Sequence, residues 1–400
     1  MSTRLAFLAL LLLVAPVSSR AQRITGTVLR GDPAVAAVGV LVEVRSSARP
    51  TGAAPQQAPV ARAPQRALTD SRGVFRVTLA TGADSVFIRV LRPGFRPHVV
   101  PAMRVSDAAA RPLRITLGEQ PITIAAVQVR ESRICGPRSE SDAWSLWESA
   151  RTVLQSIELT ERDTTIRIWT VEFQGEATEQ GTVQVRDSTI KHISNIPPLP
   201  PAYYDSLYKF GYIRRNADTT VYYAPNATVL ADDYFIDNYC FRVASKDSTP
   251  KGSIGVRFEP MRNPRVTDIA GTFWLDAETY LLQRIEFDYV NAPATHRMPG
   301  TGGDVLFTKL PSGHWILSEW STRMARSVLT REPPRRTVRV QNGSTFQNRG
   351  RPIAASYPLR WSKDLWARSQ VVYRVQQDET TLQYDASADS IARRIIKRTP

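Results

Sequence analysis

The stretch from Leu68 to Val100, LTDSRGVFRVTLATGADSVFIRVLRPGFRPHVV, decides the fold expected for the first part of the chain. Within it, Val74 to Leu79 and Val86 to Leu91 alternate apolar and polar residues, which is the two-residue period of half-buried strands. The connection between the two runs contains Gly82, so we expect them to pair as a hairpin. Thr69 to Gly73 precedes the first run and predicts a turn, with an Asp that bonds its own backbone and a Gly for positive φ.

Further alternating runs flank this stretch and complete a domain over residues 22–130. They are Ile24 to Leu29, Val38 to Arg45, Leu113 to Leu117 and Ile122 to Val129. The segment 46–66, which contains ARPTGAAPQQAPVARAPQR, has few large apolar side chains. We therefore expect it to be an exposed, disordered loop inside the domain.

Three motifs of this domain, ITGTVL, VGVLVEV and LTDSRGVFRVTL with its continuation GADSVFIRVLRPGFRP, resemble the carboxypeptidase regulatory-like domain. The resemblance rests on Gly26, Val28, Thr69, Asp70, Gly73, Phe75, Gly94 and Phe95. It implies a small β-sandwich of the transthyretin-like or prealbumin-like kind. It also implies an accessory module of exported proteins, sometimes assigned a carbohydrate-binding-like fold.

The family name raises the question of a zinc carboxypeptidase, which needs clustered histidine and carboxylate ligands. The four histidines are His98, His192, His296 and His314, and none belongs to an H-E-x-x-H motif. We therefore expect no zinc carboxypeptidase activity. The sequence indicates no catalytic, metal-ligating or cofactor-binding residues and no cofactor.

The first 21 residues have the pattern of a secretory signal peptide. Arg4 precedes the apolar run Leu5 to Val14, and Ser19 and Ala21 are small residues at the positions that a signal peptidase reads. An uncleaved membrane anchor is the alternative, although the run is shorter than the ~20 residues that span a bilayer. We expect an exported protein, located in the periplasm, associated with the outer membrane, or secreted, with no transmembrane segment in the mature chain.

The composition and net charge favour a globular protein and argue against a disordered or nucleic-acid-binding one. The 400 residues are 42% hydrophobic and 22% charged, which is typical of a globular chain rather than a disordered one. The net charge is +15, but the basic residues are scattered through the predicted strands. This favours contact with an anionic surface over a nucleic-acid groove, so no nucleic-acid partner is expected.

The second part of the chain follows a polar linker over residues 131–140 and extends over residues 141–400. Trp144, Trp147, Ala150, Leu154 and Ile157 recur at steps of three and four, which predicts one amphipathic helix. Strand patterns follow, including the hairpin IAGTFWLDAETYLLQRIEFDY over residues 269–289. We expect a curved antiparallel sheet, half-barrel-like, packed on that helix, so the whole chain is mostly β.

This half is faintly similar to the open half-barrels of periplasmic lipoprotein carriers. It is also similar to the uncharacterised C-terminal halves of exported bacterial proteins that carry the same first domain. The two cysteines, Cys135 and Cys240, are expected to form a disulfide in an exported chain. Two separate buried thiols are the alternative.

Three functions remain open from the sequence. The first is a non-enzymatic envelope protein whose curved sheet binds an apolar or polymeric ligand, or a protein partner, on an aromatic concave face. The second is a carbohydrate-binding protein, whose candidate stacking platforms are Trp144, Trp147, Trp315 and Trp320. The third is a hydrolase whose acids meet only in the folded chain, with Asp232, Asp233 or Glu259 as candidates.

Overall fold

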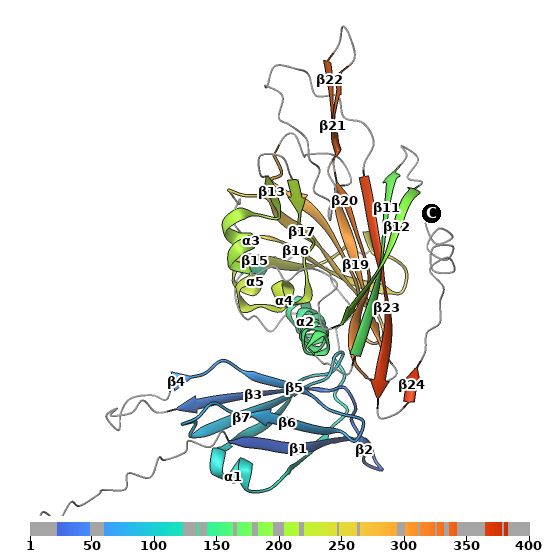
Figure 1. The fold of residues 1–400 in the computed structure, drawn as a ribbon. Helices are drawn as coiled ribbons and strands as arrows, with labels where there is room; N and C mark the ends of the chain where they lie inside the picture. The colour runs from blue at the N-terminus through green and yellow to red at the C-terminus, as the bar shows by residue number, and fades with distance from the viewer. Residues whose placement is uncertain are drawn as a thin grey trace, which may run out of the picture.

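The computed structural model contains two β-rich domains with one long helix between them (Figure 1). Each domain has its own hydrophobic core. The structure describes residues 22–48, 60–122, 134–135, 142–162, 166–177, 183–194, 204–215, 220–245, 248–261, 265–293, 301–310, 313–324, 326–331, 336–341, 365–377 and 380–382. The expected signal peptide, most of the linker and the C-terminal residues after 382 lie outside these ranges.

The first domain is a β-sandwich of two sheets with a shared apolar core. One sheet contains β1 (Arg23–Arg30), β2 (Val35–Ala36), β6 (Val74–Thr78) and β9 (Leu113–Leu117), of which β9 runs parallel to β1. The other contains β3 (Leu41–Ala48), β4 (Val60–Ala61), β5 (Gln65–Leu68), β7 (Ser85–Leu91) and β8 (His98–Arg104). The short helix α1 (Val105–Ala110) follows β8.

The predicted hairpin between the two central runs is wrong, although both runs are strands. β6 pairs with β1 in one sheet, whereas β7 pairs with β3 and β8 in the other. Phe75 and Val77 of β6 are buried, and so are Ile88 and Val90 of β7, as the alternation predicted. The connection crosses the sandwich, so the two apolar faces meet in the core instead of lying side by side.

The predicted turn before β6 forms as expected. Asp70 accepts hydrogen bonds on Oδ1 from the backbone N–H groups of Arg72 and Val74, both at 2.9 Å. Gly73 has φ +73°, and a Cβ there would lie 2.5 Å from the Val28 carbonyl oxygen. The turn therefore requires glycine both for its dihedral and for the close approach of β1.

The expected disordered loop over residues 46–66 is wrong at both ends. Residues 46–48 continue β3, and residues 65–66 belong to β5, which pairs antiparallel with β3. Residues 49–59, the middle of that segment, lie outside the described ranges. Pairing along β3 supplies backbone hydrogen bonds, which order a segment that has few large apolar side chains.

The second domain is built on one large antiparallel sheet. Its described strands run in the order β10, β15, β16, β17, β18, β19, β20, β23, β11, β12, and β24 pairs with β23. Their bounds are β10 (Ile134–Cys135), β11 (Ile166–Ala177), β12 (Val183–Ser194), β15 (Tyr239–Val243), β16 (Ser253–Pro260), β17 (Asp268–Asp276), β18 (Leu282–Val290), β19 (Gly302–Lys309), β20 (Trp315–Met324), β23 (Leu365–Gln377) and β24 (Thr380–Leu382). Two short hairpins stand apart from it, β13 (Ile213–Arg215) with β14 (Thr220–Tyr222) and β21 (Arg326–Arg331) with β22 (Arg336–Gln341).

Helix α2 (Asp142–Glu161) lies against the inner face of this curved sheet, beside the sandwich (Figure 1). Three shorter helices cover another part of the sheet: α3 (Tyr204–Phe210), α4 (Ala227–Ala231) and α5 (Asp233–Asn238). The expectation of a mostly β chain, with a sandwich followed by a curved antiparallel sheet on one amphipathic helix, is confirmed. The three short helices add to that picture.

The two cysteines lie opposite each other on neighbouring strands. Cys135 of β10 is the register partner of Cys240 of β15. Cys240 is disulfide-bonded, and Cys135 is the other cysteine of the chain. The bond holds the edge strand β10 to the sheet, close to where the chain enters the second domain.

Candidate functional site

Helix α2 is shared by both domains because its two faces differ in character. Leu146, Trp147, Ala150, Leu154 and Ile157 are fully buried in the core of the second domain. The opposite face carries buried hydroxyl groups. Those of Thr152, Ser156 and Thr160 donate to the carbonyl oxygens four residues earlier, at 2.7–2.8 Å. These bonds satisfy the hydroxyl groups within the helix. The polar face can therefore pack on the sandwich without leaving a buried hydroxyl unpaired.

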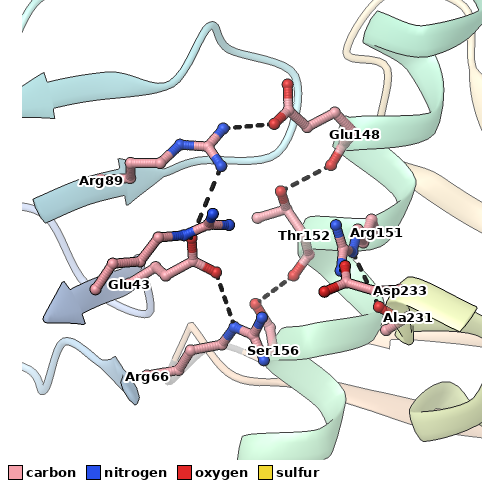
Figure 2. Close-up of polar contacts among 10 residues, drawn as sticks. Glu43, Arg66, Arg89, Glu148, Arg151, Thr152, Ser156, Ala231 and Asp233 are labelled. Atoms are coloured by element: carbon pink, nitrogen blue, oxygen red, sulfur yellow. Dashed lines mark hydrogen bonds and ion pairs between the residues drawn. The ribbon is translucent and has the colours of Figure 1, made fainter. Parts of the chain in front are cut away.

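An ion-pair network connects this polar face to the sandwich (Figure 2). Arg89 of β7 contacts Glu148 of α2 at 2.5 Å and Glu43 of β3 at 3.7 Å. Glu43 is buried and also accepts from Arg45 at 2.8 Å and Arg66 at 3.1 Å. Burial alone would raise the pKa of Glu43, but the three guanidinium groups together hold its pKa below the ordinary value.

Backbone contacts at Gly94 reinforce this junction. The N–H of Gly94 donates to the Ser149 hydroxyl at 2.8 Å, and that hydroxyl donates to the Tyr280 carbonyl oxygen at 2.7 Å. Ser149 therefore bridges the sandwich loop after β7 and the turn between β17 and β18. A Cβ on Gly94 would lie 2.2 Å from the Thr279 carbonyl oxygen. The absence of a side chain at Gly94 therefore lets the loop after β7 approach the turn between β17 and β18 closely. This explains physically why the RPGF segment has a glycine.

Over the described strands β15 to β17, the concave face of the sheet is filled by protein side chains. Trp147 stacks on Phe241 with ring centroids 4.9 Å apart, and it also contacts Phe235 and Phe273. Arg151 of α2 donates to the Ala231 carbonyl oxygen at 2.9 Å and pairs with Asp233. The expected aromatic lining is present, but it packs on α2, α4 and α5.

Stacking of a sugar on the predicted tryptophans is wrong for three of the four. Trp147, Trp315 and Trp320 are only 0%, 4% and 5% exposed, because all three contribute to the core of the second domain. Trp144 is half-buried and packs against the same core. Buried indoles have no free face for a ligand, so these residues act in folding.

A cavity of about 720 Å³ lies beside the core, between α3, α5 and the start of β17. Its volume falls within the range of small-molecule sites. Its apolar and aromatic wall includes Leu207, Val229, Tyr234, Phe235, Pro260, Met261 and Val266. This cavity is the candidate functional site.

A chain of polar groups reaches into the cavity from its inner wall. Tyr239 donates a hydrogen bond to Oδ1 of Asp268, and Tyr239 and Tyr212 are hydrogen-bonded to each other. Burial raises the pKa of both phenols well above the ordinary value, so both remain protonated donors at neutral pH.

Asp268 is the acidic end of this chain. Burial raises its pKa above the ordinary value, although hydrogen bonds from Tyr239 and from the N–H of Ile269, at 2.8 Å, act in the opposite direction. Both of the bonds that it accepts from described residues fall on Oδ1. Among the described residues, no donor bonds to Oδ2, and Asp268 belongs to the cavity lining, where a ligand hydroxyl or amine would be the natural donor to its carboxyl group.

Charged side chains stand around the opening of the cavity. Lys209, Asp237 and Arg265 belong to its lining and are exposed to solvent. Tyr208, also in the lining, is exposed and packs edge-on against Tyr234, with ring centroids 5.1 Å apart. The site thus has an apolar body, one half-buried carboxyl group, and a mixed charged rim.

The acids considered for a hydrolase lie elsewhere or have structural roles. Asp232 caps α5 by accepting from the N–H of Tyr234 at 2.8 Å, and Asp233 pairs with Arg151. Glu259 lies in β16, outside the cavity lining. Across the described residues, no group of three or more His, Cys, Asp or Glu side chains is arranged to hold a metal ion.

The sequence reasoning missed the residues that form this site. Tyr212, Tyr239 and Asp268 come from three distant segments, and Asp268 follows a segment without strand or helix periodicity. A single signal was present: an Asp directly before the predicted hairpin over residues 269–289 stands at a sheet end, where polar groups gather. Only the topology brings the two tyrosines to it.

Comparison with known proteins adds no assignment. No family model matches the chain, and no curated protein matches it. Among solved structures, a 9R-lipoxygenase from Cyanothece PCC8801 is similar with a TM-score of 0.18 and 12% identity. The match covers 76% of this chain and 42% of the lipoxygenase, so this chain spans less than half of that protein. A score this low carries no argument about fold or function.

Proposed function

We propose that this chain is an exported, non-enzymatic envelope protein that binds a small amphipathic ligand in the cavity beside α3 and α5. The observation that carries the proposal is the combination of an apolar wall with the two buried phenols of Tyr212 and Tyr239 beside the half-buried Asp268. A ligand with an apolar body and a hydroxyl or amine group matches both parts. The apolar body lies along Leu207 and Phe235, and the polar group donates to Oδ2 of Asp268.

The first domain is the accessory module in this proposal. Its resemblance to the carboxypeptidase regulatory-like domain supports that role, as does its packing on α2. The sandwich holds one face of α2 through Glu43, Arg89 and Glu148, while the other face of α2 supports the ligand-binding domain. The described residues contain no helix that is both long and apolar enough to cross a membrane.

Export is tested by expressing the full chain in a Gram-negative bacterium and sequencing the N-terminus of the mature protein. The proposal expects the protein in the periplasmic or outer-membrane fraction, beginning at Gln22. Recovery in the cytoplasmic fraction with Met1 intact would contradict this part of the proposal.

Ligand binding is tested by isothermal titration calorimetry with dodecylamine, a single-chain amine with an apolar body. Asp268→Asn keeps the shape of the side chain but removes its charge. A hydrogen bond to a charged group contributes about 1.5–3 kcal/mol, so affinity should fall at least about tenfold. Val229→Phe, which fills the cavity wall, should reduce affinity without changing the charge.

The matched control is Glu278→Gln, which removes an exposed carboxylate in the turn between β17 and β18. Its affinity for dodecylamine should equal that of the wild type. The proposal fails if the wild type does not bind the amine, or if Asp268→Asn and Glu278→Gln bind it equally well.

A further inference from the structure

Two of the exposed large apolar side chains stand next to the cavity. Among the described residues, Val35, Val99, Tyr208 and Phe210 are the large hydrophobic side chains that are exposed. Tyr208 is 65% exposed and Phe210 is 54% exposed, both in α3. Burial of an aromatic ring is favourable, so two such rings in one short helix require an explanation.

Basic side chains surround these two rings. The ammonium group of Lys209 lies 5.2 Å from the centroid of the Phe210 ring, and the guanidinium group of Arg214 lies 5.4 Å from it. Arg265 is an exposed cation of the cavity lining. We call Tyr208, Lys209, Phe210, Arg214 and Arg265 the aromatic–basic rim.

The rim is fixed in position by the fold. The guanidinium group of Arg214 donates to the Ser206 hydroxyl at 2.7 Å and stacks on Tyr223, 4.5 Å from its centroid. Gly211 ends α3 with φ +78°, and the next residue, Tyr212, donates its N–H to the Thr267 carbonyl oxygen at 2.8 Å. The end of α3 is therefore attached to the segment that leads into β17, and the rings project from a held backbone.

The rim is continuous with the candidate site. Tyr208, Lys209 and Arg265 belong both to the rim and to the cavity lining, whereas Phe210 belongs to the rim alone. Asp237 is the exposed carboxylate of the same opening, against the three cations of the rim. Asp268 is a second carboxyl group of the cavity lining, so the excess of positive charge belongs to the rim, where Lys209, Arg214 and Arg265 stand against Asp237; the whole chain carries a net charge of +15.

We propose that the aromatic–basic rim docks on an anionic phospholipid surface. A tyrosine ring is stable at the level of lipid head groups, a phenylalanine ring is stable at the boundary with the acyl chains, and lysine or arginine beside them is attracted to lipid phosphates. A stable protein interface buries about 800 Å² on each partner around an apolar centre. Two exposed rings flanked by cations form a smaller apolar centre than such a protein interface has, and they fit a lipid interface better than a protein one. This inference rests on the proposed function, because docking places the cavity opening at the source of an amphipathic ligand.

The test is co-sedimentation of the mature full chain with two kinds of vesicle, one of phosphatidylcholine and one of equimolar phosphatidylcholine and phosphatidylglycerol. We expect the wild type to bind the anionic vesicles and to be released by added salt. Phe210→Ser should weaken binding about tenfold, since it removes a ring from the interface without changing charge. Its matched control, Val99→Ser, changes a side chain of 49% exposure on β8 and should leave binding unchanged.

A second pair of variants tests the charge. Lys209→Gln should weaken binding about fivefold, the effect of one basic residue near an anionic surface. Lys251→Gln removes an exposed lysine at the opposite end of β16 from Pro260, which lines the cavity, and should have little effect. Equal weakening by the two lysine variants would show that net charge alone drives binding and would overturn the proposal.

The same variants separate this inference from ligand binding itself. Phe210→Ser should bind the vesicles about tenfold more weakly but keep its affinity for dodecylamine, because Phe210 does not line the cavity. Asp268→Asn should keep vesicle binding but lose affinity for the amine. Absence of vesicle binding in the wild type, or equal binding by Phe210→Ser and Val99→Ser, refutes membrane docking even where amine binding persists.

Discussion

Replacing Gly94 by Ala tests whether the sandwich and the second domain are docked as one unit. The new Cβ would lie 2.2 Å from the Thr279 carbonyl oxygen, which no Cβ tolerates, so the loop or the turn must move. Movement breaks the 2.8 Å bond from the Gly94 N–H to Ser149, which contributes about 1 kcal/mol. The φ of +80° adds about 1–2 kcal/mol for any side chain. The free energy of unfolding should therefore fall by about 2–3 kcal/mol.

Gly82→Ala is the matched control, because only the backbone cost applies there. Gly82 has φ +76°, and the nearest atom to a Cβ is Nη2 of Arg62 at 3.6 Å, an ordinary contact. Gly82→Ala should therefore lower the free energy of unfolding by about 1–2 kcal/mol.

Differential scanning calorimetry measures both variants against the wild type. Each kcal/mol lowers Tm by roughly 2–4 °C in a domain of this size. Docked domains should unfold in one transition, and Gly94→Ala should broaden or split it, whereas Gly82→Ala should only shift it. The reasoning is refuted if Gly94→Ala lowers Tm no more than Gly82→Ala does, or if both leave a single sharp transition.

Two further predictions concern other parts of the second domain. Burial, helped by Glu158, raises the pKa of Glu161 to about 8. The folded chain therefore keeps a proton that the unfolded chain releases, and stability falls as pH rises from the ordinary carboxyl range to about 8. Glu161→Gln should remove most of that loss of stability, which is at most about 5 kcal/mol. Urea unfolding at about pH 5 and about pH 9 measures it. A pH profile unchanged by the substitution contradicts this prediction. Removing the disulfide with the double change Cys135→Ser and Cys240→Ser should destabilise the chain by up to about 4.7 kcal/mol, the chain-entropy value for a loop of about 100 residues. Thermal unfolding with and without reductant measures it, and a wild-type Tm insensitive to reductant contradicts the expectation.

Alternating residues predicted which side chains are buried but not which strands are neighbours. Phe75 and Ile88 are both buried, as their period required, yet they belong to opposite sheets. A two-residue period specifies a face, and the connection after β6 is long enough either to turn back or to cross the core. The choice depends on β1 and β3, which supply the pairing partners from more distant sequence.

A bulge explains a local error in the hairpin of β17 and β18. Simple alternation places Gln283 on the same face as Ile285, but Gln283 is exposed and Leu282 is buried. The register shifts after Trp274, because Trp274 pairs with Arg284 and Leu275 with Leu282. One extra residue exchanges the two faces beyond it, and no residue type in the sequence marks that position.

The candidate site was the least predictable part. The stretch Tyr203 to Phe210 followed by Gly211 predicts a short helix, and α3 ends at Phe210. The helices α4 and α5 are too short for helical periodicity to stand out, although Asn226 and Asp232 cap them with hydrogen bonds to Val229 and Tyr234. Without those helices, Tyr239 has no predicted position relative to Asp268. Tertiary packing alone brings the polar chain together.

The strand order has a consequence for synthesis on the ribosome. Among the described strands, β11 and β12 join the large sheet only through β23, which lies between β11 and β20. A nascent chain therefore completes this hairpin long before its neighbour emerges, and the hairpin has an unsatisfied edge during the interval. Chains that terminate before Leu365 should retain that edge permanently, because β23 is the described strand that pairs with it.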